Sequence, residues 1–438
     1  MTLTEQVRLA GVVGAGGGGF PAHVKLASRA DIVIANGAEC EPLLHKDAAT
    51  MEHMAARVVR GVELAMQSVA AKQGVIGIKA KKKQAVEAIA DACSGTRVRL
   101  HLLGDYYPAG DEYDLVHAVT GRLIPPQGIP LQVGVVVQNV ETLVNIAAAA
   151  DGHPVTHKTI TIAGAVHHPL SLTVPIGMLY RDVLAAAGGM LSDDSVLCIG
   201  GLMMGRISTD LDTPVTKTDS GAIVLPRSHP VVRRKLQPAQ VQASIGKSAC
   251  DQCRYCTEFC PRYLLGYAVE PHQVMRSLAF TATGQAHWNE FAALCCACGL
   301  CTLYACPEAL YPKEACDTSK EELRKMNFKW TGAAPAQPHP LHDGRRTPIQ
   351  SLMRKLAIEE YDHHAPLENL RSHPTRLVLP LKQGAGVPNM PRVKAGDRVT
   401  AGQPLGDIPA GQLGAIIHAP VAALVASVTD NITLHIIP

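Results

Sequence analysis

The chain has 438 residues, of which 47% are hydrophobic and 18% are charged, and its formal net charge is +3. This length exceeds that of one ordinary domain, and the composition is that of a folded protein with several cores. A charge so close to neutral excludes a general affinity for nucleic acid or anionic lipid. No apolar run reaches the length of a membrane span, and the first residues lack the features of a cleavable signal, so we expect a cytoplasmic protein.

Short apolar runs alternate with amphipathic stretches between residues 31 and 103. The runs DIVIANG, GVIGIKA and TRVRLHLLG predict buried strands, and apolar residues at three- and four-residue spacing between them predict helices. Strands and helices in alternation indicate a mainly parallel sheet with helices on its faces. We therefore expect an α/β domain over residues 1–154, which ends with the helix VETLVNIAAAADG.

The rest of the chain changes in character several times. Short strands around a single helix predict a small α+β module over residues 155–240. A cysteine-rich region with helical pieces follows at 241–330. Residues 331–370 begin with a stretch rich in Pro, Gly and polar residues, so we expect a linker and a helix there. The last part, 371–438, is strand-like with closely spaced glycine turns.

Nine of the thirteen cysteines lie in two short runs. Because a reducing compartment opposes disulfides, such clustering indicates metal binding. The first run has the pattern C-x2-C-x2-C-x3-C-P and the second has C-x2-C-x2-C-x4-C-P. The cysteines of the two patterns are Cys250, Cys253, Cys256 and Cys260, followed by Cys295, Cys298, Cys301 and Cys306.

This spacing is typical of a pair of [4Fe–4S] clusters. Three thiolates separated by two intervening residues each can bind three corners of one cuboidal cluster. The distal cysteine of each run binds the other cluster. This rule assigns Cys306 to the first run's cluster and Cys260 to the second run's cluster. Two zinc sites are the alternative, but zinc favours two short Cys pairs separated by a longer loop. Cys296 is interpreted as a bystander.

The segment GVVGAGGGGFPAHVKL, residues 11–26, contains six glycines around a turn. Residues without a Cβ let backbone N–H groups approach a phosphate or a ring, and a flexible loop is the alternative. Gly14, Gly16 and Gly19 also fit G-x-G-x-x-G, which is a weak match because a strand should precede a dinucleotide fingerprint.

The segment NGAECEP follows the predicted strand DIVIA, at the carboxyl end where open α/β sheets bind ligands. Asn36 can bind a ring edge or a ribityl hydroxyl there. Glu39 and Glu41 are carboxylates two residues apart that a nucleotide ribose can use. A solvated loop is the alternative interpretation of both carboxylates.

The motifs GAGGGGFP, NGAECEP and QNVETL, in this order, resemble the flavin- and NADH-binding subunit of respiratory complex I and, more closely, the C subunit of Rnf-type electron-transport complexes. This resemblance implies FMN in the α/β domain, with NADH stacked on the flavin. It implies that Phe20 and Glu41 contact NADH. The complex I motif GEE is matched only loosely, by Gly110, Asp111 and Glu112. The FMN candidates that it implies are Gly16, Gly17, Gly18, Lys25, Asn36, Glu39 and Asn139.

The resemblance covers nearly the whole chain and implies a multidomain α/β protein. Its parts are a Rossmann-like FMN/NADH domain, a β-grasp ligand-binding module, a double [4Fe–4S] ferredoxin-like helical domain and a carboxyl-terminal barrel-sandwich hybrid. The tail resembles biotinyl/lipoyl-like domains, but Gln412 stands at the position of the carrier lysine, so no cofactor can be attached. Rnf C subunits carry this domain at the amino end. Its carboxyl-terminal position here resembles the cobalamin reductases of propanediol-utilisation bacterial microcompartments.

That family implies an NADH-dependent oxidoreductase in which electrons pass from NADH through FMN and two clusters to a corrinoid. Cob(III)alamin would be reduced toward cob(II)alamin or cob(I)alamin, and no catalytic acid or base is expected. The family also implies a place within a microcompartment, with an adenosyltransferase and shell proteins as candidate partners, and leaves an oligomer possible. Two alternatives stay open: a subunit that passes electrons to a protein partner, and a non-enzymatic electron shuttle at a microcompartment shell.

Overall fold

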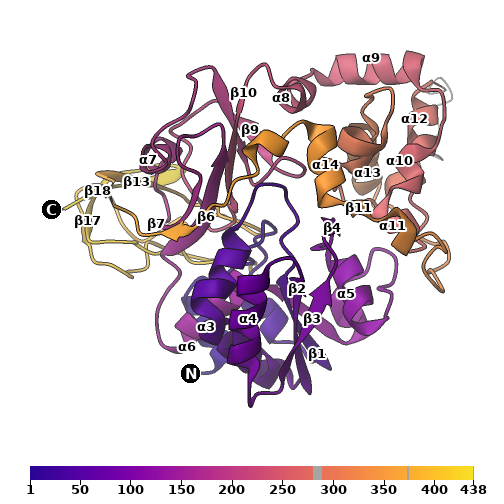
Figure 1. Cartoon of the computed structure of the whole chain (residues 1–438). Helices are drawn as coiled ribbons and strands as arrows, with labels where there is room; N and C mark the ends of the chain where they lie inside the picture. The colour runs from indigo at the N-terminus through magenta and orange to yellow at the C-terminus, as the bar shows by residue number, and fades with distance from the viewer. Residues whose placement is uncertain (280–288, 372–373, 438) are drawn as a thin grey trace.

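The computed structural model describes residues 1–279, 289–371 and 374–437 (Figure 1). The amino-terminal part is built around a four-stranded parallel sheet with the strand order β3-β2-β1-β5. This is the order found in one half of a doubly wound nucleotide-binding fold. The strands are β1 (Ile32–Gly37), β2 (Gln73–Lys79), β3 (Val98–Leu103) and β5 (Val135–Asn139).

Helices cover both faces of this sheet, which explains why its strands are nearly continuous apolar runs. Val33 and Ala35 of β1 face the core shared with α3, α4 and α6, whereas Ile34 faces α5. The alternation of strands and helices predicted from the sequence is confirmed. The helices are α3 (Lys46–Val69), α4 (Lys83–Cys93), α5 (Glu112–Thr120) and α6 (Val140–Ala150), with α1 (Leu3–Leu9) and α2 (Ala22–Leu26) before them.

The second sheet belongs to the β-grasp module and has the order β12-β7-β6-β10-β8-β9. Five of its strands and one helix come from one stretch of chain: β6 (His157–Gly164), β7 (Leu170–Pro175), α7 (Tyr180–Ala186), β8 (Ser195–Ile199), β9 (Arg206–Ser208) and β10 (Gly221–Pro226). The sixth, β12 (Leu367–Glu368), pairs in parallel with β7. In addition, β11 (Thr347–Pro348) pairs with β4 (Tyr106–Tyr107) of the first domain. The segment 331–370 therefore contributes strands to two sheets.

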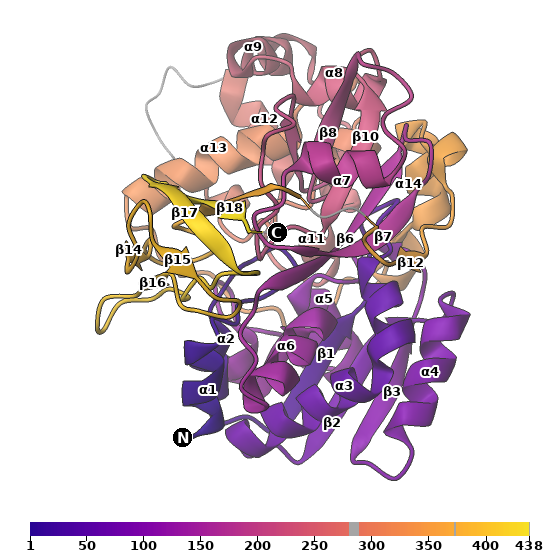
Figure 2. The same ribbon diagram turned by 90° about the vertical axis from the view of Figure 1, so that its left-hand side faces the viewer.

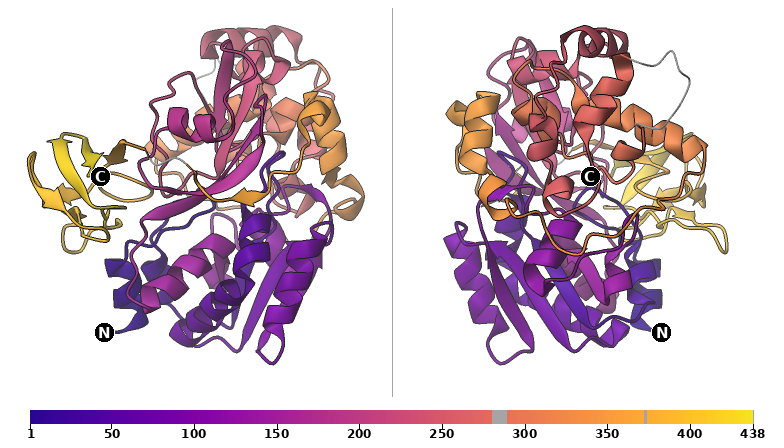
Figure 3. Two further views of the ribbon diagram at one scale, coloured as in Figure 1. Left: turned by 60° about the vertical axis from the view of Figure 1, so that its left-hand side comes forward. Right: turned by 90° about the vertical axis from the view of Figure 1, so that its right-hand side faces the viewer.

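The cysteine-rich region is a set of short helices above the α/β domain in both views of Figure 3. The two cysteine runs lie on different elements, and helix α14 packs beside the second run. The elements are α8 (Pro230–Lys235), α9 (Ala239–Ala249), α10 (Tyr255–Glu258), α11 (Pro261–Leu264), α12 (Pro271–Ala279), η3 (Asn289–Ala292), η4 (Cys301–Ala305), α13 (Pro312–Lys325) and α14 (Ile349–Leu356).

The carboxyl-terminal domain has a four-stranded sheet of order β13-β18-β17-β15 and a two-stranded sheet of β14 and β16. It lies beside α1 and α2, on the opposite side of the β-grasp module from the helical region (Figures 1 and 2). Its strands are β13 (Arg376–Pro380), β14 (Met390–Pro391), β15 (Arg398–Val399), β16 (Gly406–Asp407), β17 (Ala423–Val428) and β18 (Asn431–Ile436). The α/β fold class, with its four kinds of domain, is thus confirmed, while the domain boundaries stay a prediction.

A buried lysine joins this carboxyl-terminal domain to the rest of the molecule. The ammonium of Lys217 donates to the carbonyl oxygens of Gly11 and Ile416, each at 2.7 Å. Gly11 has φ +67°, and a Cβ there would lie 2.0 Å from the Ile416 oxygen. The close approach of these two backbone segments therefore requires glycine at position 11.

We expect Gly11→Ala to lower stability more than Gly152→Ala does. Both glycines have a positive φ, but a Cβ at Gly152 meets nothing within 4 Å. The control variant should lose about 1 kcal/mol from its left-handed backbone, and Gly11→Ala about 1–3 kcal/mol more from overpacking. Thermal unfolding, with limited proteolysis of the carboxyl-terminal domain, measures the difference. Equal losses in the two variants would contradict the close approach.

Candidate functional site

A cavity of about 360 Å³ lies at the carboxyl ends of β1 and β5. Its wall is formed by the glycine-rich loop, the loop after β1, residues 107–112, the end of β5 and two β-grasp residues, Met204 and Ser220. Cys296 and Cys298 of the second cysteine run complete it. The structure therefore brings together the motifs that the sequence places far apart. Eight of the nine candidate flavin and NADH residues line the cavity: Gly16, Gly18, Phe20, Lys25, Asn36, Glu39, Glu41 and Asn139.

The glycine-rich loop is closed by hydrogen bonds between its two ends. The Gly14 N–H donates to the Phe20 oxygen at 2.9 Å, and the Gly19 N–H donates to the Gly14 oxygen at 3.1 Å. Gly17 has φ +104° and is not among the lining residues. A Cβ at Gly16 would lie 3.3 Å from the amide nitrogen of Asn139. Helix α1 precedes this loop, so the G-x-G-x-x-G match is not a strand-to-helix fingerprint.

The two asparagines of the cavity use their amides to fix its walls. Asn139 caps α6, where its side-chain oxygen accepts from the Glu141 N–H, and its amide nitrogen donates to Asp47 at 2.8 Å. Asn36 donates to the Gly110 oxygen at 2.9 Å. The neighbouring Gln138 lines the cavity, is buried, and leaves its amide nitrogen without a hydrogen-bond partner. Gln138 was not a candidate from the sequence, although QNVETL contains it.

The two glutamates after β1 have different surroundings. Glu41 accepts hydrogen bonds from the backbone N–H groups of Met203 and Met204, at 3.0 and 2.8 Å. Burial raises the pKa of Glu41, and these two N–H groups act against the increase. Glu41 therefore ties the loop after β1 to the β-grasp module. Burial and the negative charge of Asp47 raise the pKa of Glu39 to about 7.

A buried network of charges lies behind the cavity. Lys46 and Lys158 both bind the carboxylate of Glu141, and Lys158 also donates to the Ala15 oxygen of the glycine-rich loop at 2.9 Å. Burial opposes ionisation of Glu141, but the charges of Lys158 and Lys46 outweigh it and lower its pKa. Lys46 also pairs with Asp47. These residues were not predicted, because no local spacing connects them.

A thiol of the second cysteine run lies among the thiols of the first run. Burial raises the pKa of Cys256 to about 12, and the neighbouring thiols of Cys250, Cys306 and Cys253 add to the increase. Cys306 of the second run thus lies beside the first three cysteines of the first run. This arrangement fits the ligand exchange that the spacing predicts.

The remaining thiols form a second set. Burial raises the pKa of Cys260 well above its ordinary value, with the thiols of Cys296 and Cys295 as further causes. Cys298 and Cys301 both lie close enough to Cys260 to interact electrostatically with it. Among the described residues, no three His, Cys, Asp or Glu side chains are placed to hold a single metal ion. The four thiols of a cuboidal cluster instead bind four separate iron atoms.

The extra residue in the second run has a local structural explanation. Residues Cys301–Ala305 form a π-helical turn, η4, immediately before Cys306. A π-helical turn contains one residue more than an α-helical turn, and such turns are frequent at functional sites. The turn therefore absorbs the fourth intervening residue and leaves Cys306 beside the first run.

Direct contacts connect the second set of thiols to the cavity. The Tyr107 hydroxyl donates to the Cys298 oxygen at 2.7 Å. Arg262, two residues after Cys260, pairs with Asp111 at 2.9 Å and lies 3.4 Å over the ring of Tyr113. Asp111 belongs to the loosely matched GEE segment, all of which lines the cavity. The helical region is thereby fixed against the cavity wall.

Four family models match the chain and agree with this geometry. They are the Nuo51 FMN-binding domain over residues 7–148, the SLBB domain over 159–207, the 4Fe-4S dicluster domain over 249–311 and the RnfC barrel sandwich hybrid domain over 358–436. The cavity fits a flavin, because it has a glycine cradle and an unpartnered buried donor in Gln138. The fold and site define a flavin and iron–sulfur electron-transfer protein.

Curated relatives give the family. The chain is 42% identical to the cobalamin reductase PduS of Citrobacter freundii over 98% of this chain and 95% of the relative. It is also 42% identical to that of Salmonella typhimurium, with the same coverage. The C subunit of the proton-translocating ferredoxin:NAD(+) oxidoreductase complex of Clostridium ljungdahlii is 37% identical over 59% of this chain and 55% of the relative. The chain belongs to the PduS cobalamin reductase family, which confirms the resemblance drawn from its motifs. None of the helices described has the length and apolar character needed to cross a bilayer.

The ligand exchange predicts that cysteines from different runs share one cluster. We expect Cys253→Ala and Cys306→Ala to remove the same electron paramagnetic resonance signal from the reduced protein, and Cys260→Ala to remove the other. Each change should lower the iron content by about half, because each cluster holds four irons. Cys93→Ala, at the end of α4, is the control and should keep both signals. Loss of different signals from the Cys253 and Cys306 variants would exclude the exchange.

Glu39 lines the cavity, so its titration predicts a pH dependence of FMN binding. Its pKa of about 7 lies above the ordinary 4.5, so the carboxyl is mostly neutral at pH 6 and mostly charged at pH 8. A charged Glu39 repels the phosphate of a nucleotide in the cavity, so the Kd for FMN should rise about two- to fivefold over this interval. Glu39→Gln stays neutral and should give a flat profile. If the variant keeps the wild-type profile, Glu39 is not the titrating group.

Proposed function

We propose that the chain is an NADH-dependent reductase that passes electrons through FMN and two [4Fe–4S] clusters to a corrinoid. The observation that supports this proposal most is that two kinds of residue line the same cavity. The glycine-rich loop forms one side, and Cys296 and Cys298 form another. A group bound in the cavity would therefore touch both the nucleotide-binding loops and the second set of thiols.

FMN would occupy this cavity, with contacts from the lining residues Gly16, Gly18, Lys25, Asn36, Glu39 and Asn139, while Gly17 belongs to the same loop but lies outside the lining. When bound, FMN supplies the exchange between the two-electron chemistry of NADH and the one-electron chemistry of the clusters. Phe20 lies at the cavity and is 36% exposed, so its ring can pack against an incoming nicotinamide. Each carboxylate oxygen of Glu41 already accepts a backbone hydrogen bond, so Glu41 would contact NADH only through the remaining lone pairs of these oxygens.

The residues of the chain bind and orient in this scheme, and none acts as an acid or base. Lys25 donates to the Val137 oxygen at 2.9 Å and pairs with Glu112, which holds the rim of the cavity together. Gln138 offers its free amide donor to a ring edge. The network around Glu141 fixes the glycine-rich loop from behind.

The two sets of thiols would hold the clusters in series. Cys260, Cys295, Cys298 and Cys301 would bind the cluster beside the cavity. Cys250, Cys253, Cys256 and Cys306 would bind the other. Because Cys256 and Cys301 interact across the two sets, the clusters would be neighbours. Electrons would therefore leave the cavity through the nearer cluster and reach the farther one next.

The relatives supply the acceptor in this proposal. Two proteins with 42% identity over almost the whole chain are named cobalamin reductases. By this likeness we infer a corrinoid substrate, a place in a propanediol-utilisation microcompartment, and an adenosyltransferase and shell proteins as candidate partners. The domain boundaries 1–154, 155–240, 241–330, 331–370 and 371–438 are part of the same proposal.

The test is an anaerobic assay of the reconstituted protein with NADH and cob(III)alamin. We expect NADH oxidation and corrinoid reduction in a ratio of one NADH to two cobalt centres, because each NADH carries two electrons. Turnover with artificial dyes but none with corrinoid would favour a subunit that serves a protein partner. Protein that holds iron and never FMN would favour an electron shuttle.

A further inference from the structure

A second cavity, of about 570 Å³, lies in the helical region, and neither the flavin nor the clusters account for it. Its walls come from three elements that are far apart in the sequence: α10, η4 and α14. The lining residues are Tyr255, Phe259, Tyr304, Ala305, Ser351, Arg354 and Lys355. We call these residues the α10–α14 pocket.

The pocket lies over the first set of thiols. Tyr255 stands between Cys253 and Cys256 in the sequence, and its backbone N–H interacts with the Cys253 thiol. Ala305 directly precedes Cys306. Cys253 itself is exposed. The flavin cavity, in contrast, is lined by Cys296 and Cys298 of the other run. The α10–α14 pocket is thus at the far end of the path that leads away from the flavin.

Three of the seven residues that line this pocket are aromatic. Phe259 and Tyr304 pack edge to face, with ring centroids 5.6 Å apart. Tyr255 is 48% exposed. A large aromatic ring left open to solvent beside a cluster offers a flat surface on which a planar ligand can stack.

Positive charge borders the same pocket. Arg354 is 69% exposed in its side chain and, within the described part of the chain, has a single ion pair, with Glu359 at 3.4 Å. Lys355 is exposed and has no ion pair with any residue that the structure describes. Two adjacent cations beside open aromatic faces match a ligand that combines a flat ring system with a phosphate.

We propose that the α10–α14 pocket binds the corrinoid acceptor. One face of the macrocycle packs on Tyr255, and the phosphodiester of the nucleotide loop lies near Lys355 and Arg354. The inference rests on the proposed function, and it adds the place where the acceptor binds. The first set of thiols would hold the cluster that supplies one electron to each Co(III), which would become Co(II). Two such transfers use the two electrons of one NADH and leave NAD⁺ and one proton.

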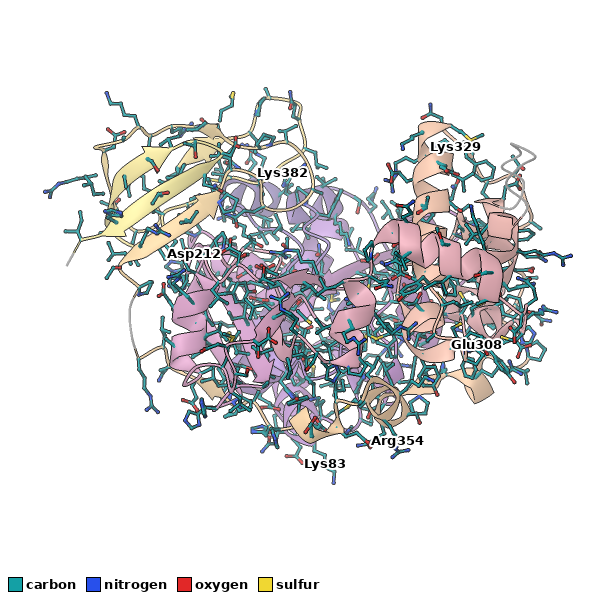
Figure 4. The ribbon with its side chains drawn as sticks, turned by 90° about the horizontal axis from the view of Figure 1, so that it is seen from above. Lys83, Asp212, Glu308, Lys329, Arg354 and Lys382 are labelled. Atoms are coloured by element: carbon teal, nitrogen blue, oxygen red, sulfur yellow. The ribbon has the colours of Figure 1, made fainter. Side chains whose placement is uncertain are left out.

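Charge reversal at the pocket tests the proposal. Lys355→Glu should raise the Kd and the KM for cob(III)alamin about tenfold, because it places a negative charge beside the phosphodiester. Equilibrium dialysis of the oxidised holoprotein, without NADH, measures the Kd. Lys329→Glu makes the same charge change at the opposite edge of the molecule from Arg354 (Figure 4) and is the matched control. NADH oxidation with a one-electron dye should be unchanged in both variants.

A corrinoid without the phosphate makes the test specific. Cobinamide lacks the nucleotide loop, so Lys355→Glu should leave its Kd and KM within about twofold of wild type. Tyr255→Ala removes the ring and should weaken the binding of both corrinoids about fivefold or more, since the apolar contact of the ring contributes roughly 1 kcal/mol or more.

The outcomes separate the two proposals. Wild-type protein that reduces no corrinoid would refute the proposed function. Wild-type protein that reduces corrinoid, with Lys355→Glu equal to Lys329→Glu in Kd and KM, would refute the pocket assignment alone. A loss of equal size with cobinamide would also refute it, because the phosphodiester would then not be what Lys355 contacts.

Discussion

The architecture depends on a buried network of two carboxylates, Glu141 and Asp47, and the two lysines that neutralise them. Glu141 lies in the first turn of α6, Lys46 begins α3, and Lys158 comes from β6 of the β-grasp module. Each lysine side chain is 1% exposed, so loss of either one would leave the two buried carboxylates with a single positive charge between them. Such a change typically costs about 3–5 kcal/mol. Because Lys158 also binds the Ala15 oxygen, the network fixes the glycine-rich loop relative to two domains.

The same principle governs the junction between the cavity and the thiols. Two of the described polar contacts cross it, from Tyr107 to the Cys298 oxygen and from Arg262 to Asp111. A third contact, from Glu41 to the N–H groups of Met203 and Met204, joins the cavity to the β-grasp module. Each contact gives a buried polar group a hydrogen-bond partner, which lowers the cost of burying that group between the domains. Electron transfer over fixed distances needs this kind of rigid arrangement, since the cofactors do the chemistry and the protein positions them.

The sequence predicts the parts of this molecule whose signals are local. Buried strands, amphipathic helices and tight cysteine spacing are each contained in a short window, and the fold class they indicate is confirmed. The cavity could be anticipated because the three motifs are predicted to lie at the same edge of the sheet. The charge network could not, because Lys46, Glu141 and Lys158 share no periodicity. The backbone partners of Glu41 and the strands contributed by residues 331–370 are likewise long-range pairings.

The carboxyl-terminal domain has a structural role at the glycine-rich loop. Gln412 is exposed on its loop, where a carrier domain would need a lysine. Yet the Ala385 N–H donates to the Gly19 oxygen at 3.0 Å, and a Cβ on Gly19 would lie 2.6 Å from the Gly384 Cα. The domain therefore packs against the outer side of the loop that the charge network holds from within. A loop with so many glycines has high conformational entropy when free, so contact on both sides is what keeps its backbone in place.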